Sequence, residues 1–378
     1  MTHLALAAIS ARPMAEAAAR EGFKAIALDL FGDRDTLSAA SEWLPIGAPE
    51  TLRIDAKRLL DALHALARRG DVLGWLAGAG FDGQSELLAQ GAARLPLIGT
   101  APADQRRVRD PATFFAFLKA CGFAYPPVRH HGATQAAGWL AKDAGGCGGW
   151  HITRAEPAAP APRSPQRYLQ REVRGVSMSA TYIANGRDAV VLGFNEQIVR
   201  PLGALPWVYH GVLGPVPVAE AVRSEVGAAL RALTPTFALR GLGSLDFLLD
   251  GDRVLILEVN PRPPASLALY GRVGSGGVLG AHLRACQQGE LPAVARAASA
   301  PVNGHQIVFA PHPLRLDDAT LTRWAAGAHL HDQPRAATRF ASGEPVCSVS
   351  ASGADADSVK IELARRSDAV LRTLETLT

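Results

Sequence analysis

GSLDFLLDGDRVLILEVNPR, residues 243–262, contains two apolar runs separated by a short polar turn. The runs are Leu245–Leu249 and Val254–Val259, and the turn is Asp250-Gly251-Asp252. Apolar runs on either side of a glycine-containing turn favour a β-hairpin. Glu258 and Asn260 are two residues apart, so their side chains should share one face of the sheet. The stretch therefore predicts a largely buried hairpin that carries polar groups.

Three oxygen-bearing side chains of this hairpin form a candidate cation site: Asp246, Glu258 and Asn260. Asp246 lies among apolar neighbours, and a buried carboxylate needs a cation or hydrogen-bond partners. Carboxylate and amide oxygens suit Mg²⁺, with Mn²⁺ as an alternative, and Mg²⁺ commonly joins carboxylates to substrate phosphates. If the hairpin had only a structural role, Arg262 or Arg240 would pair with these carboxylates instead.

A glycine-rich loop is the second motif. Trp139–Lys142 has the pattern of an apolar strand ending in a lysine, and four glycines follow closely: Gly145, Gly146, Gly148 and Gly149. Glycines let backbone N–H groups point at an anion, and the lysine adds a positive charge. The pattern predicts a phosphate-binding loop, although it is not the GxxxxGK[ST] loop. A flexible surface loop is the alternative.

The third motif, Tyr168–Gly175, reads as a strand with polar side chains. Before it, EPAAPAPRSPQ at residues 156–166 has the composition of an exposed, polyproline-like connection. Polar groups of the strand could hydrogen-bond the edge of an adenine. Taken alone, the motif is weak.

The first hundred residues alternate between strand and helix patterns. Strands are expected at Leu4–Ile9, Lys24–Asp29 and Val72–Leu76, and helices at Arg12–Arg20 and Ile54–Arg69. Such alternation predicts an α/β domain with a parallel sheet.

Asp29 raises the alternative of a nicotinamide-dependent oxidoreductase. It ends a strand about twenty residues after the first turn, where a ribose-binding carboxylate would stand. However, the turn at 10–14 reads Ser-Ala-Arg-Pro-Met and lacks the glycines that let a backbone approach a pyrophosphate. We therefore expect no dinucleotide site there.

The rest of the chain shows further helix and hairpin signals. Asp110-Pro111 has the pattern of a helix N-terminus, and Asn185-Gly186 that of a hairpin turn. Other expected elements are a helix at Ala219–Leu233, short strands at Gln306–Phe309, Ala336–Phe340 and Val346–Ser350, and a terminal helix at Asp355–Leu377.

Composition narrows the functional class. The 378 residues suggest two or three domains. The net charge of +4 is spread along the chain without a basic stripe, so a nucleic-acid partner is not expected. No apolar run reaches the length of a membrane span. The four cysteines form no CxxC pair, so a zinc site is not indicated and a reducing, cytoplasmic environment is expected.

In this order, the motifs resemble the ATP-grasp superfamily of carboxylate–amine ligases, in the branch related to biotin carboxylase. The motifs that carry the resemblance are Arg109-Asp110, Lys142 with its glycine loop, Gln170, and Asp246 followed by Glu258-Val-Asn260-Pro-Arg262. The tail at residues 340–348 also resembles this branch, without a biotin-attachment motif. The implied fold is mixed α/β and α+β. A Rossmann-like domain over 1–100 precedes an ATP-grasp domain over 101–300, whose glycine-loop lid lies near 125–185, and a small β-rich segment occupies 301–378.

The resemblance also implies roles for the residues. ATP and Mg²⁺ would be bound, with Lys142 and Arg109 on the phosphates and the loop glycines closing over them. Adenine would be read by Gln170, Glu172 and the backbone near Val173. Asp246, Glu258 and Asn260 would hold one or two Mg²⁺, and Arg262 would act with Lys142 in catalysis.

Two positions depart from the family pattern. The family often has a lysine at Arg109, and a guanidinium lacks the point-like charge of an ammonium. Ser177 stands where many members carry a ribose-binding glutamate, so the ribose contacts must come from elsewhere. The opening, Ser10-Ala-Arg-Pro13, resembles ATP-grasp proteins that accompany tetrahydromethanopterin- or methanofuran-linked one-carbon metabolism, which would suggest cofactor assembly.

The activity expected from the resemblance is ligation of small-molecule substrates. A carboxylate would be activated as an acyl phosphate with release of ADP, and an amine would then displace phosphate. The acceptor pocket is expected between the N-terminal domain and the hairpin, lined by Ser10, Arg12, Phe81, His210, Ser266 and Tyr270. His210 is a candidate base toward the amine. A non-catalytic ATP-binding sensor or scaffold is the alternative, and a homodimer is in keeping with the family.

Overall fold

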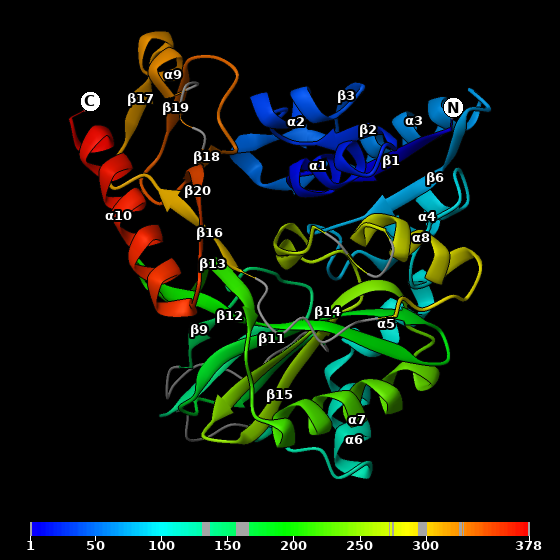
Figure 1. Cartoon of the computed structure of the whole chain (residues 1–378). Coiled ribbons are helices and arrows are strands. Elements are labelled where there is room, and N and C mark those ends of the chain that lie inside the picture. The colour runs from blue at the N-terminus through cyan, green and yellow to red at the C-terminus, as the bar shows by residue number, and fades with distance from the viewer. Residues whose placement is uncertain are drawn as a thin grey trace.

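The structure, a computed structural model, describes residues 2–130, 137–155, 166–271, 273, 276–293, 301–324, 327 and 329–376. Apart from Gln166, the predicted polyproline-like connection lies outside the described residues. Figure 1 shows the N-terminal part, in blue, above a large central sheet in green. The C-terminal strands and last helix lie along one side.

The N-terminal part is built on a parallel four-stranded sheet in the order β3-β2-β1-β6. Its strands are β1 (His3–Ala7), β2 (Lys24–Asp29), β3 (Glu42–Pro45) and β6 (Val72–Ala77). Alternate residues of β1 face opposite layers, as a strand requires. Leu4 and Leu6 pack with helix α1 (Arg12–Arg20), and Ala5 and Ala7 with α3 (Ala56–Ala67) and α4 (Ser85–Ala92). The predicted α/β class is confirmed. The remaining elements here are α2 (Arg34–Ala39), β4 (Gly47–Ala48), η1 (Pro49–Thr51) and β5 (Arg53–Ile54).

Asp29 has a structural role. Its carboxylate accepts hydrogen bonds from the amides of Ala11 and Gly32, both at 2.9 Å, and from Trp43 Nε1 at 2.8 Å. The side chain is fully buried. A ribose contact would break these bonds, and an uncompensated buried acceptor is costly. The dinucleotide alternative therefore loses its candidate carboxylate.

Two short helices, α5 (Pro102–Arg109) and α6 (Pro111–Ala120), lead out of the N-terminal part. Asp110 caps α6 by accepting from the amide of Thr113 at 2.8 Å, as its position before Pro111 predicts. The chain then forms a small antiparallel sheet in the order β7-β10-β8-β9. Its strands are β7 (Val128–Arg129), β8 (Trp139–Asp143), β9 (Thr153–Arg154) and β10 (Arg167–Arg171), and we call this sheet the lid.

An eight-stranded sheet forms the centre, in the order β15-β14-β11-β12-β13-β16-β20-β18. Its bounds are β11 (Val176–Asn185), β12 (Ala189–Leu202), β13 (Leu205–Val216), β14 (Arg240–Asp250), β15 (Arg253–Asn260), β16 (Val302–Phe309), β18 (Leu330–His331) and β20 (Pro345–Gly353). Helix α7 (Glu220–Thr236) packs on the apolar face of β11, β12 and β15. On the other face, α8 (Val278–Gln287) lies between the central and N-terminal sheets (Figure 1).

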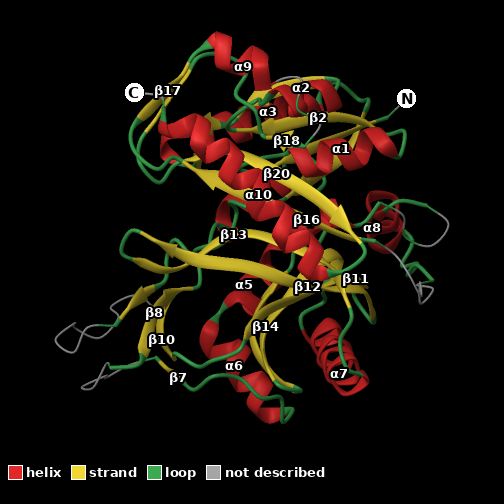
Figure 2. Cartoon of the chain, turned by 60° about the vertical axis from the view of Figure 1, so that its left-hand side comes forward, coloured by secondary structure: helices red, strands yellow, loops and turns green. Residues whose placement is uncertain are grey.

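The C-terminal strands extend this central sheet. β16 pairs with β13, and β20 with β16, while α10 (Ala356–Glu375) covers both (Figure 2). Asp355 caps α10, where the sequence places the helix start. The other elements are η2 (Ala265–Leu269), β17 (Leu314–Leu316), α9 (Asp318–Trp324) and β19 (Thr338–Phe340).

Candidate ATP and metal site

The predicted hairpin forms from β14 and β15, and its polar side chains gather on the face opposite α7. Asp246 pairs with Glu258 and Ser244 with Asn260 in the register, and paired residues share a face. Asn260 Nδ2 donates to Asp246 Oδ2 at 3.1 Å. Asp246 Oδ1 is shielded from solvent and has no hydrogen-bond partner among the described residues. An orphaned carboxylate oxygen beside a second carboxylate and an amide fits a divalent cation.

The two carboxylates differ electrostatically. Burial and the negative charge of Glu258 raise the pKa of Asp246 to about 7. Burial alone would also raise the pKa of Glu258, but Arg109 and Lys142 hold it below its usual range. Ser244, Gln197 and Arg262 lower the pKa of Asp246, but they do not outweigh burial and the charge of Glu258.

Arg109 connects the hairpin to the glycine loop. Its Nη1 donates to Glu258 Oε2 at 3.0 Å and to Asn260 Oδ1 at 3.1 Å. Its Nη2 donates to the carbonyls of Ala144 at 2.6 Å and Gly146 at 3.1 Å. The Arg109 side chain is 9% exposed. A structural pairing of the hairpin carboxylates was expected with Arg262 or Arg240, but the arginine that bonds Glu258 is Arg109, which comes from α5.

The glycine loop lies against the turn that contains Gly83 and against β13. Gly145 approaches Gly83, Gly148 accepts a hydrogen bond from the amide of Tyr209 at 3.0 Å, and Gly149 packs on Trp207. Gly149 has a φ of 79°, and a Cβ there would lie 1.8 Å from the carbonyl oxygen of Trp207. A residue with a side chain cannot occupy this position unless the loop moves.

Lys142 and Gln170 are partners in the lid. Lys142 Nζ donates to Gln170 Oε1 at 3.1 Å, and both side chains are buried. Gln170 Nε2 has no partner among the described residues. Glu172 accepts from Trp207 Nε1 at 3.1 Å, and neighbouring Val173 is half-buried. The lid thus offers a buried cation and a spare amide donor on one strand pair.

Arg262 is held by Asp82, a residue that the sequence analysis did not select. Arg262 Nε donates to Asp82 Oδ1 at 3.1 Å and Oδ2 at 3.2 Å. Burial alone would raise the pKa of Asp82, but Arg262 and Arg109 hold it below its usual range. The available signal was the glycine turn at 78–83, in which Asp82 is the ionisable residue.

The predicted acceptor residues bond different partners in the described part of the chain. Ser10 and Arg12 both bond Asp332, the Arg12 Nε at 2.7 Å, where the N-terminal part meets the C-terminal segment. Ser266 Oγ lies 2.7 Å from Thr181 Oγ1, and Tyr270 OH donates to Asn195 Oδ1 at 2.7 Å. These two residues therefore belong to a polar network on β11 and β12.

His210 and Phe81 have other surroundings. His210 lies at an irregularity of β13, where Nδ1 contacts Val208 O at 3.0 Å and the ring packs on Phe309. Burial and the charge of Asp246 raise the pKa of its neighbour Tyr209, as they do that of Tyr182. Phe81 packs edge-on against Trp75 in the N-terminal core.

Ser177, the departure at the ribose position, bonds within the central sheet. Its Oγ donates to Gln197 Oε1 at 2.8 Å. Gln197 stands on β12, two residues after Asn195, and so extends the same polar face.

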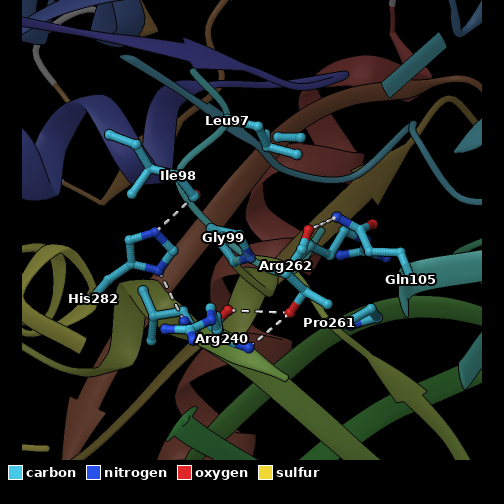
Figure 3. A pocket seen from close by; sticks show the side chains of 12 residues that line it. Leu97, Ile98, Gly99, Gln105, Arg240, Pro261, Arg262 and His282 are labelled. Carbon is cyan, nitrogen blue, oxygen red and sulfur yellow. Dashed lines mark hydrogen bonds between the residues drawn. The ribbon is translucent and has the colours of Figure 1, made fainter. Parts of the chain in front are cut away.

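A cavity of about 80 Å³ lies beside Arg109 and opens between the glycine loop and the N-terminal part. Its lining includes Asp82, Gly83, Arg106, Arg109 and Gly145. Figure 3 shows a second, much smaller hollow behind Arg262, bordered by Ile98, Gln105, Arg240 and His282. His282 Nδ1 accepts from the amide of Leu242 at 2.8 Å, so Nε2 carries the proton and donates to Ile98 O at 3.1 Å.

Comparison with known proteins agrees with this arrangement. Residues 108–266, which include the glycine loop and the polar hairpin, match the family described as ATP-grasp domain. Residues 108–266 are therefore similar to ATP-grasp domains. Over 208 residues it is 27% identical to the carbamoyl phosphate synthase large chain of Thermus thermophilus, covering 49% of this chain and 20% of that one. The match thus spans about a fifth of the length of this curated relative.

Solved structures share the fold along nearly the whole chain. Biotin carboxylase from Campylobacter jejuni, in complex with β-γ-ATP, superposes with a TM-score of 0.71 at 13% identity, covering 99% of this chain and 95% of that one. N5-carboxyaminoimidazole ribonucleotide synthetase from Thermus thermophilus gives 0.64 at 19% identity, with 97% and 98% covered. Phosphoribosylglycinamide synthetase from Anaerococcus prevotii gives 0.63 at 12%, with 96% and 97% covered. The predicted ATP-grasp fold is confirmed. Among the described residues, no helix has both the length and the apolar character needed to cross a membrane.

Proposed function

We propose that this chain is an ADP-forming ligase that activates a substrate carboxylate with ATP and joins it to an amine. The observation that carries the proposal is the convergence of Lys142, Arg109 and Arg262 with the oxygen donors of the hairpin under one glycine loop. Positive side chains and oxygen ligands at one place suit a polyphosphate and its cation.

The reaction has two steps. A carboxylate oxygen attacks the γ-phosphorus of ATP, the bond to the β–γ bridging oxygen breaks, and ADP leaves with that electron pair. The amine nitrogen then attacks the acyl carbon, the bond to the phosphate oxygen breaks, and phosphate leaves. The nitrogen loses a proton to solvent or to a nearby base, and an amide remains.

The residues of this chain would mainly position groups and neutralise charge, which is most of what phosphoryl transfer requires. Lys142 and Arg109 would bind phosphate oxygens, and the loop glycines would offer backbone amides. The spare Nε2 of Gln170 and the backbone near Val173 would bind adenine. Arg262, oriented by Asp82, would face the transferred phosphoryl group.

The oxygen donors of Asp246, Glu258 and Asn260 fit Mg²⁺, or Mn²⁺, which would supply charge neutralisation on the phosphate oxygens. This role is supported by the pairing of Asp246 with Glu258 and by Asp246 Oδ1, which has no hydrogen-bond partner among the described residues. Glu258 and Asn260 would have to exchange their Arg109 contacts for the ion.

The substrates are proposed as a small carboxylate and a small amine, in keeping with the names of the similar proteins. Cofactor assembly for one-carbon metabolism, for example addition of glutamate, remains a prediction from the opening residues. A homodimer and a cytoplasmic location are likewise predictions.

The test is ADP release with Mg-ATP, hydroxylamine and a panel of carboxylates. Hydroxylamine traps acyl phosphates, so only the carboxylate has to be guessed. Hydroxamate formed together with ADP supports the proposal and identifies the acyl donor. AMP would contradict attack at the γ-phosphate. Absence of product across the panel, with ATP still raising the Tm, would favour a non-catalytic ATP-binding protein.

Metal-site variants sharpen this test. In Glu258→Gln, turnover should fall about 10²–10³-fold, the scale of one lost electrostatic partner, while the fold is kept. Asp250→Asn is the matched control, because Asp250 is an exposed carboxylate in the turn of the same hairpin. If Glu258→Gln and Asp250→Asn lose turnover equally, the cause is damage to the hairpin and not the loss of a metal ligand.

A further inference from the structure

Arg109 uses two of the oxygen donors that the proposed metal would need. Its Nη1 bonds both Glu258 Oε2 and Asn260 Oδ1. Asn260 Oδ1 also accepts from Arg262 Nη2 at 3.4 Å. A carbonyl oxygen has two lone pairs, so Asn260 Oδ1 is already saturated by two guanidinium donors. A cation about 2.1 Å from this oxygen would meet two positive groups.

The same side chain holds the glycine loop. Arg109 Nη2 bonds the carbonyls of Ala144 and Gly146, so one guanidinium joins the hairpin to the loop. Gly146 is further restrained by His151, whose ring would lie 2.2 Å from a Cβ at that position. Removal of Arg109 from the hairpin would therefore also release the loop from it.

A third observation indicates a ligand that can draw Arg109 away. Its Nε has no hydrogen-bond partner among the described residues, although the side chain is nine-tenths buried. Arg109 also lines the cavity of about 80 Å³ beside the loop. A guanidinium with an unused N–H beside a cavity suits an anion with several oxygens, such as a phosphate group, which binds arginine in bidentate geometry.

We propose that Arg109 is a positioning residue that takes the place of the metal on Glu258 and Asn260 until nucleotide phosphates bind it. This inference rests on the proposed function, and it adds an order to the binding events. Without nucleotide, a metal ion meets a ligand set in which Glu258 Oε2 and Asn260 Oδ1 are already bonded to Arg109. Nucleotide phosphates engage Arg109, and this frees the two hairpin oxygens and the loop together. A lysine, with a single ammonium, cannot bridge four acceptors in this way.

The test measures Mn²⁺ binding to the protein without nucleotide, by electron paramagnetic resonance of the free ion. Arg109→Gln should bind Mn²⁺ about tenfold or more tightly than the unmodified chain, because two charge-assisted hydrogen bonds no longer compete. Arg106→Gln is the matched control: it removes the same charge from the same helix and cavity wall, and Arg106 does not bond the hairpin. If Mn²⁺ affinity rises as much in Arg106→Gln as in Arg109→Gln, the effect comes from the loss of positive charge in general, and the proposal is overturned.

A second readout follows the loop. Cys147 lies between Gly146 and Gly148, and its labelling by a thiol reagent can be followed by mass spectrometry with exposed Cys121 as an internal reference. In Arg109→Gln, labelling of Cys147 relative to Cys121 should be about tenfold faster, since two bonds to the loop are lost. Unchanged labelling would overturn the link between hairpin and loop.

Failure of the inference is distinct from failure of the proposed function. If the unmodified chain binds Mn²⁺ without nucleotide as tightly as Arg109→Gln, the competition is wrong, while ADP release still tests ligase activity. If Arg109→Gln shows tighter Mn²⁺ binding and faster labelling, the inference holds even where no carboxylate of the panel reacts. Circular dichroism of each variant establishes that it has folded.

Discussion

Asp82 orients Arg262 in the candidate site through a pair of hydrogen bonds. Both of its oxygens bond Arg262 Nε, and its side chain is 4% exposed. Without this partner, a buried guanidinium would keep its charge but lose its orientation.

Asp82→Asn should therefore lower turnover about tenfold or more, with a smaller change in KM for ATP, because Arg262 is expected to act on the transferred group. The measurement is kcat in the hydroxamate assay. Asp104→Asn serves as the control, since Asp104 pairs with Arg107 on the surface of α5. An unchanged kcat in Asp82→Asn would contradict the role given to Arg262.

The polar hairpin could be predicted at the level of residues because it depends on local spacing. A two-residue period places Glu258 and Asn260 on one face. Asp246 joins them because a register shift between Asp246 and Phe247 pairs it with Glu258, and the sequence does not reveal that shift. Asp82 could not be predicted in this way, since its partner lies 180 positions further along. For the same reason the sequence does not reveal that Arg12 bonds Asp332, 320 positions further along.

At the scale of elements, the glycine loop and β13 depend on each other. Gly148 accepts from Tyr209, and Gly149 has room only for a hydrogen where it meets Trp207. The loop is thus shaped to lie on a strand that follows it by some sixty residues in the sequence.

Gly149→Ala should weaken ATP binding while the chain still folds. Positive φ by itself costs about 1 kcal/mol, and the contact with Trp207 O adds a displacement of the loop. Gly203→Ala is the matched control, because Gly203 also has a positive φ but has nothing within 4 Å of a Cβ. Both variants would be compared by ATP titration and Tm. Equal loss of ATP binding in the two would refute the contact argument.

β13 also shows why one element was missed in the sequence. Leu205–Val216 contains Pro206, Gly211, Gly214 and Pro215, and such residues argue against a strand. Pairing with β12 on one side and β16 on the other overrides this local preference. The helix α1 and strand β2, by contrast, lie where the apolar pattern predicts them.

At the scale of the whole molecule, Arg12 joins the beginning of the chain to its C-terminal segment. The side chain is 7% exposed and bonds Asp332 through Nε and Nη2, with Glu16 and Asp35 nearby. Breaking such a pair leaves buried negative charge without compensation.

Arg12→Met should lower the free energy of unfolding by about 3–5 kcal/mol, as measured by urea denaturation. Lys57→Met removes an exposed ion pair with Asp61 and should change the free energy of unfolding by about 0.5 kcal/mol or less. A double variant that also carries Asp332→Leu should recover part of the loss. If Arg12→Met and Lys57→Met have equal effects, the buried pair does not hold the two segments together.

His282 gives the molecule a dependence on pH. Burial lowers its pKa from the usual value to about 4, and the neutral ring joins Ile98 to Leu242 (Figure 3). Because the folded-state pKa is depressed, this contribution is complete above about pH 6.5 and is lost as pH falls toward 4. Unfolding should cost up to about 3 kcal/mol less at pH 4 than at pH 7 on this account.

Urea denaturation at pH 7 and pH 5, compared with His282→Gln, measures this contribution. In His282→Gln, the free energy of unfolding should differ less between pH 7 and pH 5 than it does in the unmodified chain. His64→Gln, at an exposed position on α3, should keep the full difference in unfolding free energy between pH 7 and pH 5. If the free energy of unfolding changes equally with pH in the unmodified chain and in His282→Gln, other groups cause the acid sensitivity.

The order of strands in the central sheet has a consequence for synthesis on the ribosome. β13 emerges long before β16, and its free edge must wait for Val302–Phe309 to be translated. An unpaired edge strand attracts other chains, so this interval is the period of greatest risk for aggregation. Nascent chains halted before residue 302 should therefore depend on chaperones, whereas chains released after β20 should not.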